Sequence, residues 1–173
     1  MAENPRKLLY LSLHDKLSGL VDKKLIRYVG RWNNQIDNES EERASIAPNV
    51  LIQIDNKIKG TTASSYDLQE GEVIVTCHIG INVVKVDIGT LDWEIMQAVY
   101  ETLQGECAMS DTYYEISALD RLDEIEDSNY DGYYHGKVIF CAYLKDYTKS
   151  DSRDTLSGSF TDLNGTVNSK LEI

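Results

Sequence analysis

The sequence predicts an α+β fold in which a mixed, mainly antiparallel sheet is flanked by two helices and followed by a long C-terminal β-hairpin and an extended C-terminal arm. Residues 5–21 and 91–103 place apolar residues at three- and four-residue steps, the pattern of a helix with one buried face. Other stretches alternate apolar and polar residues or run continuously apolar, as strands do. Residues 149–173 are rich in Ser, Thr, Asp, Asn and Gly, which predicts an arm without a core of its own.

Length and charge limit the kinds of protein that this chain can be. Its 173 residues predict a single domain over residues 1–148, with the arm at residues 149–173. The chain carries 17 Lys and Arg against 29 Asp and Glu, a net charge of −12, which disfavours a large phosphate-binding surface and sequence-specific DNA binding. No apolar run approaches the roughly 20 residues of a membrane helix, and the first residues are too polar for a signal peptide. We therefore expect neither membrane insertion nor secretion.

The first helix is expected to begin after Asn4, whose side-chain oxygen can cap it. Pro5 suits the first helical position because its missing N–H has no partner there. The buried stripe of this helix consists of Leu9, Leu13, Leu17, Leu20 and Val21. Residues 24–32 then favour a strand, and the polar residues 33–47 favour a long loop.

Two strands are predicted to form the centre of the sheet. Residues 50–54 are almost continuously apolar, which is typical of a strand flanked by other strands. Residues 72–86 alternate, so that Cys77 and His78 lie on opposite faces, and Gly80 suggests a bulge. The polar residues 56–71 between them are expected to form a loop or an exposed hairpin tip.

A second helix and a hairpin are predicted for the rest of the domain. The helix is expected to start at Thr90 as its N-cap and to end at Gly105, with Asp92 and Glu94 in its first turn complementing the helix dipole. Residues 113–122 and 137–147 are then predicted as two strands, joined by residues 123–136 as the hairpin loop.

One stretch partly matches a calcium-binding loop. Asp127, Asn129, Asp131 and Gly132 satisfy the first half of that motif. The match then fails, because Val138 stands where the loop needs a bidentate Glu. Asp, Asn and Gly are also the usual residues of a solvated turn, which explains the same stretch without a metal.

The remaining reactive side chains do not predict a catalytic, cofactor or metal site. The histidines are expected on a helix, a strand and a loop, without the spacing of zinc ligands: His14, His78 and His135. The thiols are odd in number and lack a C-x-x-C motif: Cys77, Cys107 and Cys141. Because Cys77 and His78 point to opposite faces of a strand, the imidazole cannot activate the thiol. We therefore predict that the chain is not an enzyme and needs no cofactor.

Charge is unevenly distributed along the chain. Residues 1–27 hold six basic and three acidic side chains, whereas residues 111–135 hold one basic and eight acidic ones. Such poles can remain separately solvated, or they can meet between copies in a head-to-tail ring. The candidate interface residues come from these poles and from the long loop: Arg6, Lys7, Trp32, Asn34, Glu41, Glu42, Asp123, Glu124, Glu126, Asp127 and Asp131.

The order of the predicted elements resembles that of the tail-terminator and tail-completion proteins of tailed bacteriophages. The resemblance covers roughly residues 5–147 and rests on a pattern of elements. It is clearest over residues 26–54, where Trp32-Asn33-Asn34-Gln35 precedes an acidic loop and a strand begins at Ala47-Pro48-Asn49-Val50-Leu51-Ile52. It is also clear over residues 71–103, where a long strand leads into a helix. The arm after Tyr147 is not part of the pattern.

The resemblance implies a structural virion protein that forms a homo-oligomeric ring at the head–tail junction or the proximal end of the tail. Such rings are most often sixfold, with twelvefold as the alternative, and DNA passes through the lumen without sequence-specific contacts. Its partners would be further copies of the chain, connector or portal-side proteins and tail proteins, first in the host cytoplasm and then in the virion neck. Two other readings stay open, a small acidic binding module and a metal- or thiol-dependent enzyme.

Overall fold

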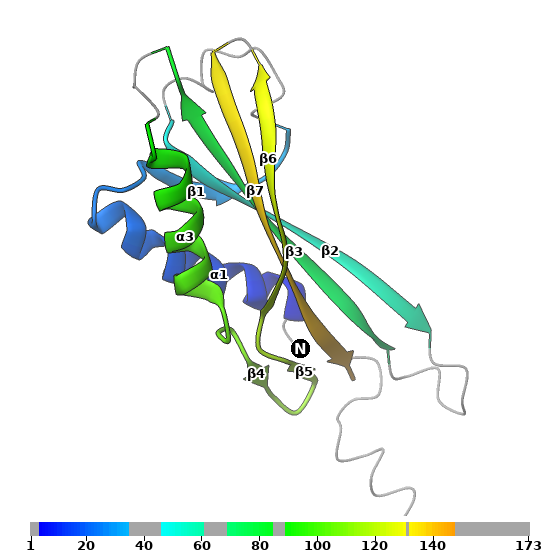
Figure 1. The fold of residues 1–173 in the computed structure, drawn as a ribbon. Coiled ribbons are helices and arrows are strands. Elements are labelled where there is room, and N and C mark those ends of the chain that lie inside the picture. Colours follow the sequence, from blue (N-terminus) through cyan, green and yellow to red (C-terminus); the bar gives the residue numbers. More distant parts are fainter. Residues whose placement is uncertain (1–3, 35–45, 61–68, 85–88, 131, 148–173) are drawn as a thin grey trace, which may run out of the picture.

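The structure, a computed structural model, describes residues 4–34, 46–60, 69–84, 89–130 and 132–147, with backbone only at residues 58–60 and 127–130. These residues form an α+β fold with a mixed sheet and two helices (Figure 1). The helices are α1 (Pro5–Asp22) and α3 (Leu91–Leu103). The strands are β1 (Tyr28–Arg31), β2 (Asn49–Gly60), β3 (Gln69–Asn82), β4 (Met109–Ser110), β5 (Tyr114–Ile116), β6 (Asp120–Tyr130) and β7 (Tyr133–Asp146).

The sheet is antiparallel except at one edge. Its strand order is β1-β2-β3-β7-β5-β4, and β6 pairs with β7 alongside β5. Only β1 and β2 are parallel among the described pairs. The β2–β3 pair projects beyond the helices at one end of the molecule, and the β6–β7 hairpin projects at the other (Figure 1). The sheet therefore has β1 at one edge and β6, β5 and β4 along the opposite edge.

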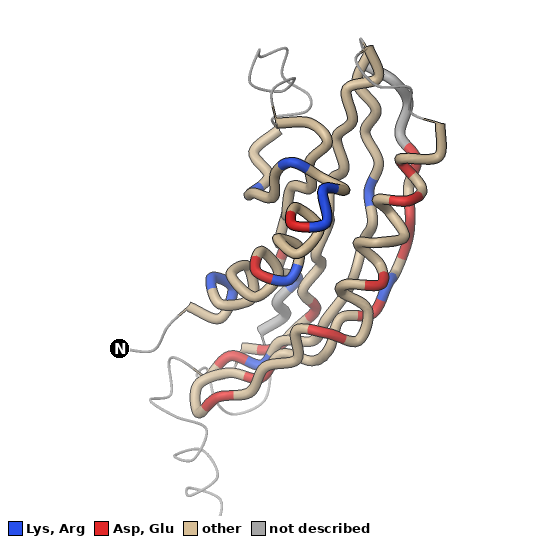
Figure 2. Tube along the Cα trace, turned by 90° about the vertical axis from the view of Figure 1, so that its left-hand side faces the viewer, with Lys and Arg blue, Asp and Glu red and all other residues tan. Residues whose placement is uncertain are grey.

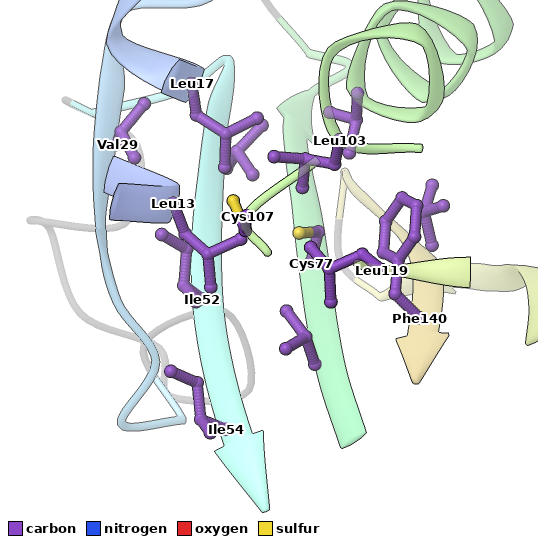
Figure 3. Packing of buried hydrophobic residues seen from close by; sticks show 14 of the residues in the cluster. Leu13, Leu17, Val29, Ile52, Ile54, Cys77, Leu103, Cys107, Leu119 and Phe140 are labelled. Atoms are coloured by element: carbon purple, nitrogen blue, oxygen red, sulfur yellow. The ribbon is translucent and has the colours of Figure 1, made fainter. Parts of the chain in front are cut away.

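Both helices lie on one face of the sheet, with α1 over β1 and β2 and α3 over β3 and β7 (Figure 1). The core fills the space between them, and Figure 3 shows side chains from both layers meeting there. Burial of apolar surface in this layer supplies most of the stability of such a fold. The largest fully buried side chains of this core are Phe140, Leu9, Leu13, Leu17, Ile52, Ile79, Ile81, Ile95, Met96, Leu103 and Leu119.

The prediction for the first helix is confirmed, and the strand that follows it is shorter than predicted. Asn4 Oδ1 accepts hydrogen bonds from the backbone N–H groups of Arg6 and Lys7, at 2.9 and 3.4 Å. The strand begins only at Tyr28, because the backbone N–H groups of Leu25 and Ile26 bind the Leu20 carbonyl oxygen at the end of the helix. These apolar residues therefore close the helix and do not extend the sheet.

The second helix is also confirmed, although its cap differs from the prediction. Thr90 makes no side-chain hydrogen bond to the backbone of the first turn, and its hydroxyl donates to Glu94 Oε1 at 2.8 Å. Gly105 follows the helix with φ of +73°, a conformation that glycine adopts without steric cost. The sequence signals at both ends thus place the helix correctly, although the Thr90 hydroxyl contacts a side chain and not the backbone as predicted.

The central strands are longer than predicted. Residues 56–60 and 69–71, expected in a loop, are paired in the antiparallel ladder of β2 and β3. The ladder is also unbroken at Gly80, which pairs with Asn49 and His135, so the predicted bulge is wrong. Residues 56–60 pair with β3, and residues 69–71 pair with both β2 and β7. This pairing explains why polar residues extend these strands, since sheet context outweighs the strand propensity of a single residue.

The C-terminal hairpin has a much shorter connection than predicted. Residues 123–130 belong to β6 and residues 133–136 to β7, so the predicted loop over residues 123–136 is wrong. The strands are connected at residues 131–132, where Gly132 has φ of +77°. A register shift between Arg121 and Asp123 marks a bulge in β6. The acidic residues of this stretch therefore lie on a strand and not in a loop.

Some predictions concern residues outside the described ranges. They include the loop positions Glu41 and Glu42, the hairpin position Asp131 and the arm at residues 149–173. Within the described residues, neither helix is long and apolar enough to cross a membrane.

Candidate functional site

Four exposed carboxylates line β6 at one edge of the sheet: Asp120, Asp123, Glu124 and Glu126. We call these four side chains the acidic strip. Paired residues of neighbouring strands share a face of the sheet. The register with β7 therefore directs Asp123 to the helix-free face, and Glu124 and Glu126 to the face that carries the helices. The acidic strip thus presents carboxylates on both sides of the strand.

Side chains of the same edge hold the acidic strip in place. Arg121 Nη1 donates to Glu124 Oε2 at 3.1 Å, and its guanidinium lies 4.0 Å from the centre of the Tyr100 ring. Trp93 of α3 donates from Nε1 to Glu126 Oε1 at 2.7 Å. Because Arg121 is the only cation among these partners, the net charge of the strip stays negative.

A basic pocket of about 330 Å³ lies between the start of α1 and the edge of the sheet. We use this name for the cavity lined by Asn4, Arg6, Lys7, Tyr10, Arg31, Ile52 and Ile54. Arg6 donates from Nη2 to the carbonyl oxygen of Ile54, which ties the first turn of α1 to β2. The N-terminal end of a helix carries partial positive charge, and this adds to the charge of the three basic side chains. The basic pocket therefore favours an anionic group.

The acidic strip and the basic pocket lie at opposite edges of the sheet. Arg31 belongs to β1, the acidic strip to β6, and the strands β2, β3 and β7 separate them. Figure 2 shows the same division, with acidic residues along α3 and β6 at one side and the basic residues of α1 at the other. One domain thus carries two surfaces of opposite charge that cannot contact each other.

The predicted interface residues do not form one surface. Arg6 and Lys7 line the basic pocket, and Asn34 is an exposed residue with φ of +65°. The carboxylates in the acidic strip are Asp123, Glu124 and Glu126. The positions whose side chains lie outside the described residues are Glu41, Glu42, Asp127 and Asp131.

Trp32, also a predicted interface residue, packs instead against the helix-free face of the sheet. Its ring is stacked on His78, with 3.8 Å between ring centres and an angle of 2° between planes. Leu51 and Tyr133 are buried beside it in a second, small apolar cluster. This cluster covers part of the sheet face that α1 and α3 do not cover.

A chain of hydrogen bonds runs under Trp32 from the interior to the surface. The Gln53 amide fixes its direction, because Nε2 donates to Asp55 Oδ2 at 2.7 Å and Oε1 is therefore the acceptor for His78 Nε2, at 2.8 Å. With its proton on Nε2, neutral His78 accepts at Nδ1 from His135 Nε2, at 2.9 Å. Both imidazoles are buried, whereas Asp55 is exposed.

The surroundings of His78 keep this imidazole neutral. Burial, and then the neighbouring His135 and Lys137, lower the pKa of His78 to about 3. A neutral ring suits the chain of hydrogen bonds, since Nδ1 must stay unprotonated to accept from His135. The hydrogen bonds therefore order the helix-free face, and His78 is uncharged at neutral pH.

Sequence reasoning missed this histidine pair. It placed His78 correctly on a strand but put His135 in a loop, so the two were not expected to meet. They are brought together because Gly80 pairs with His135, which leaves His78 diagonally adjacent to it across β3 and β7. The strand-favouring Tyr133 and Tyr134, close before the strand predicted over residues 137–147, are the signal that would have placed position 135 on a strand.

The structure confirms that the side chains of Cys77 and His78 point to opposite faces of β3. Cys77 lies in the core under the helices (Figure 3), whereas His78 is on the other face with Trp32. Burial raises the pKa of the Cys77 thiol to about 12, so it stays protonated at neutral pH. Burial also raises the pKa of Cys107, whose Sγ lies 3.6 Å from the Ser12 hydroxyl. Within the described residues, no group of three or more His, Cys, Asp and Glu side chains is placed to hold a metal ion.

These differences predict how the thiols react. In the folded protein a maleimide should label the half-buried Cys141 and leave Cys77 unlabelled until denaturant is added, because only Cys141 is accessible. Mass spectrometry of the digested protein identifies the labelled peptide. Labelling of Cys77 at the rate of Cys141 in the folded protein would contradict the burial described above.

Comparisons with known proteins add little to this geometry. No protein-family model matches the chain, and no curated protein matches it. Among solved structures, one chain superimposes over 80% of this chain and 94% of its own length, with 10% sequence identity and a TM-score of 0.46. A likeness at that level carries no argument about function, so the function must be argued from the residues themselves.

Proposed function

We propose that this chain is a structural virion protein of a tailed bacteriophage, one subunit of a homo-oligomeric ring at the head–tail junction or the proximal end of the tail. The observation that carries the proposal is the separation of the acidic strip and the basic pocket to opposite edges of one sheet. The order of the elements supports it further, because it resembles that of tail-terminator and tail-completion proteins.

Opposite charges at opposite edges favour a head-to-tail contact between copies. In such a contact each copy uses one surface to bind the copy before it and the other to bind the copy after it. The series ends only when the rotation between copies closes a ring, sixfold or twelvefold in the proteins that this chain resembles. Complementary charge also orients the copies as they approach one another.

The overall charge suits a ring through which DNA moves. With a net charge of −12 on each copy, the assembled protein repels DNA phosphates, so that DNA passes without being held. The two faces of such a ring would meet connector or portal-side proteins and tail proteins. The protein would assemble in the host cytoplasm and remain in the virion neck or tail.

The state of assembly tests this proposal. Size-exclusion chromatography with light scattering, at tens of micromolar chain, should show one species with the mass of six or twelve copies. Electron microscopy of that species and of isolated particles should show a closed ring. A strict monomer in solution together with no ring of this protein in the particles would contradict the proposal, and would favour a small acidic binding module.

A further inference from the structure

We infer that the acidic strip of one copy docks in the basic pocket of the next copy. The inference rests on the proposed ring, and it names the two surfaces that form each contact within it. The ligand of the basic pocket is then a pair of carboxylates on an exposed strand.

The first argument is the chemistry of the basic pocket. In a chain with a net charge of −12, Arg6, Lys7 and Arg31 converge on one cavity at the start of α1. Its remaining lining includes the apolar side chains Ile52 and Ile54. The basic pocket therefore suits carboxylates that are accompanied by apolar groups better than it suits a bare anion such as phosphate.

The second argument is that the acidic strip offers that combination. Leu122 and Ile125 stand among its carboxylates in the sequence of β6, and both are exposed, Leu122 by 56% of its surface. Trp93 lies beside them, 57% exposed and bound to Glu126. Large apolar side chains that a folded chain leaves exposed beside a polar rim are typical of protein interfaces.

The third argument is that the basic side of the molecule has exposed apolar residues as well. Tyr28 of β1 is 42% exposed, and Leu11 of α1 is 50% exposed. Five of the seven large hydrophobic side chains that are exposed in the described residues thus lie on α1, β1, α3 or β6. Both surfaces therefore combine charged with exposed apolar side chains, and their charges are of opposite sign.

A contact between the two surfaces requires a second copy, because they cannot meet within one chain. The strands β2, β3 and β7 stand between them. β6 is an edge strand with exposed apolar side chains, and natural proteins place charges and bulges on such edges to prevent unspecific pairing. The carboxylates and the bulge near Arg121 fit an edge that accepts one partner and rejects others.

A charge swap tests the contact. One variant carries Arg6→Glu and Lys7→Glu. It loses the hydrogen bond from Arg6 to the Ile54 carbonyl oxygen, while acidic residues themselves favour a helix N-terminus. The other carries Glu124→Lys and Glu126→Lys, at two positions whose side chains share a face of β6. Each variant alone places like charges opposite each other, and we expect the concentration for half-assembly to rise more than about tenfold. An equal mixture of the two should recover assembly, because every contact again joins opposite charges.

A matched control separates this contact from a general effect of charge. The variant Lys23→Glu with Lys57→Glu makes the same change in net charge at exposed positions outside the basic pocket, and it should assemble as the original chain does. Circular dichroism checks that each variant is folded. In the assembled protein, carbodiimide cross-linking should join Lys7 to Glu124 or Glu126.

The outcomes distinguish the contact from the ring. If both charge variants still form rings of the original size, or if the mixture of two unassembled variants does not recover, the docking of these surfaces is wrong while the ring stands. Cross-links that join only other surfaces would overturn it in the same way. If the unmodified chain forms no ring in solution or in particles, the proposed function fails together with the contact.

Discussion

Lowering the pH from 6.5 to 3 is expected to destabilise the folded chain through His78. The pKa of this imidazole is about 3 in the folded protein, whereas its ordinary value is 6.5. Between these values the unfolded chain binds a proton that the folded chain excludes, so the free energy of unfolding decreases as the pH falls. The contribution of neutral His78 to the free energy of unfolding is fully present above pH 6.5. Below pH 6.5 it decreases by up to about 1.4 kcal/mol for each pH unit.

The surroundings of His78 determine this effect. Trp32 stacks on the ring, and His135 and Gln53 bind its two nitrogens. Burial, His135 and Lys137 disfavour the charged imidazole, and a proton on Nδ1 would break the hydrogen bond that this nitrogen accepts from His135. The carboxylate in this chain of hydrogen bonds, that of Asp55, binds Gln53 and does not contact His78 directly.

A neutral substitution isolates the contribution of His78. Urea unfolding at pH 7, 5.5 and 4.5 should show a smaller dependence on pH for His78→Gln than for the original chain. The matched control His14→Gln changes a half-buried histidine of α1 outside the cluster and should retain the original dependence. Equal pH dependence in the original chain and in His78→Gln would contradict the assignment.

Truncation of Phe140 is expected to cost about 3–5 kcal/mol of unfolding free energy. Phe140 is 0% exposed on β7 and faces the layer between the sheet and the helices (Figure 3). Phe140→Ala removes its buried surface and leaves a cavity that neighbouring side chains fill only in part.

The same strand supplies a control for this loss. Tyr143 lies on the helix-free face and is exposed, so that Tyr143→Ala should cost about 1 kcal/mol or less. Equilibrium urea unfolding of both variants at pH 7 measures the difference. Equal losses for the two substitutions would show that the core does not lie between this face of β7 and the helices.

The sequence by itself determined the features of this fold that depend on near neighbours in the chain. Asn4 and Pro5 start α1, and Gly105 follows the end of α3, because a helix end is defined by hydrogen bonds within one turn. The alternation in β3 put Cys77 and His78 on opposite faces for a similar reason, since successive side chains of any strand diverge. Charge counts likewise identified Arg6, Lys7 and the carboxylates of β6.

The tertiary structure alone decided which distant residues meet. The register of β7 on β3 brought His135 to His78, and the packing of α1 against β1 and β2 brought Arg31 to Arg6 and Lys7. Residues 123–136 became strands because they pair along β7, against the turn preference of their own side chains. Register and layer packing depend on the burial of a whole face at once, and no local pattern specifies that.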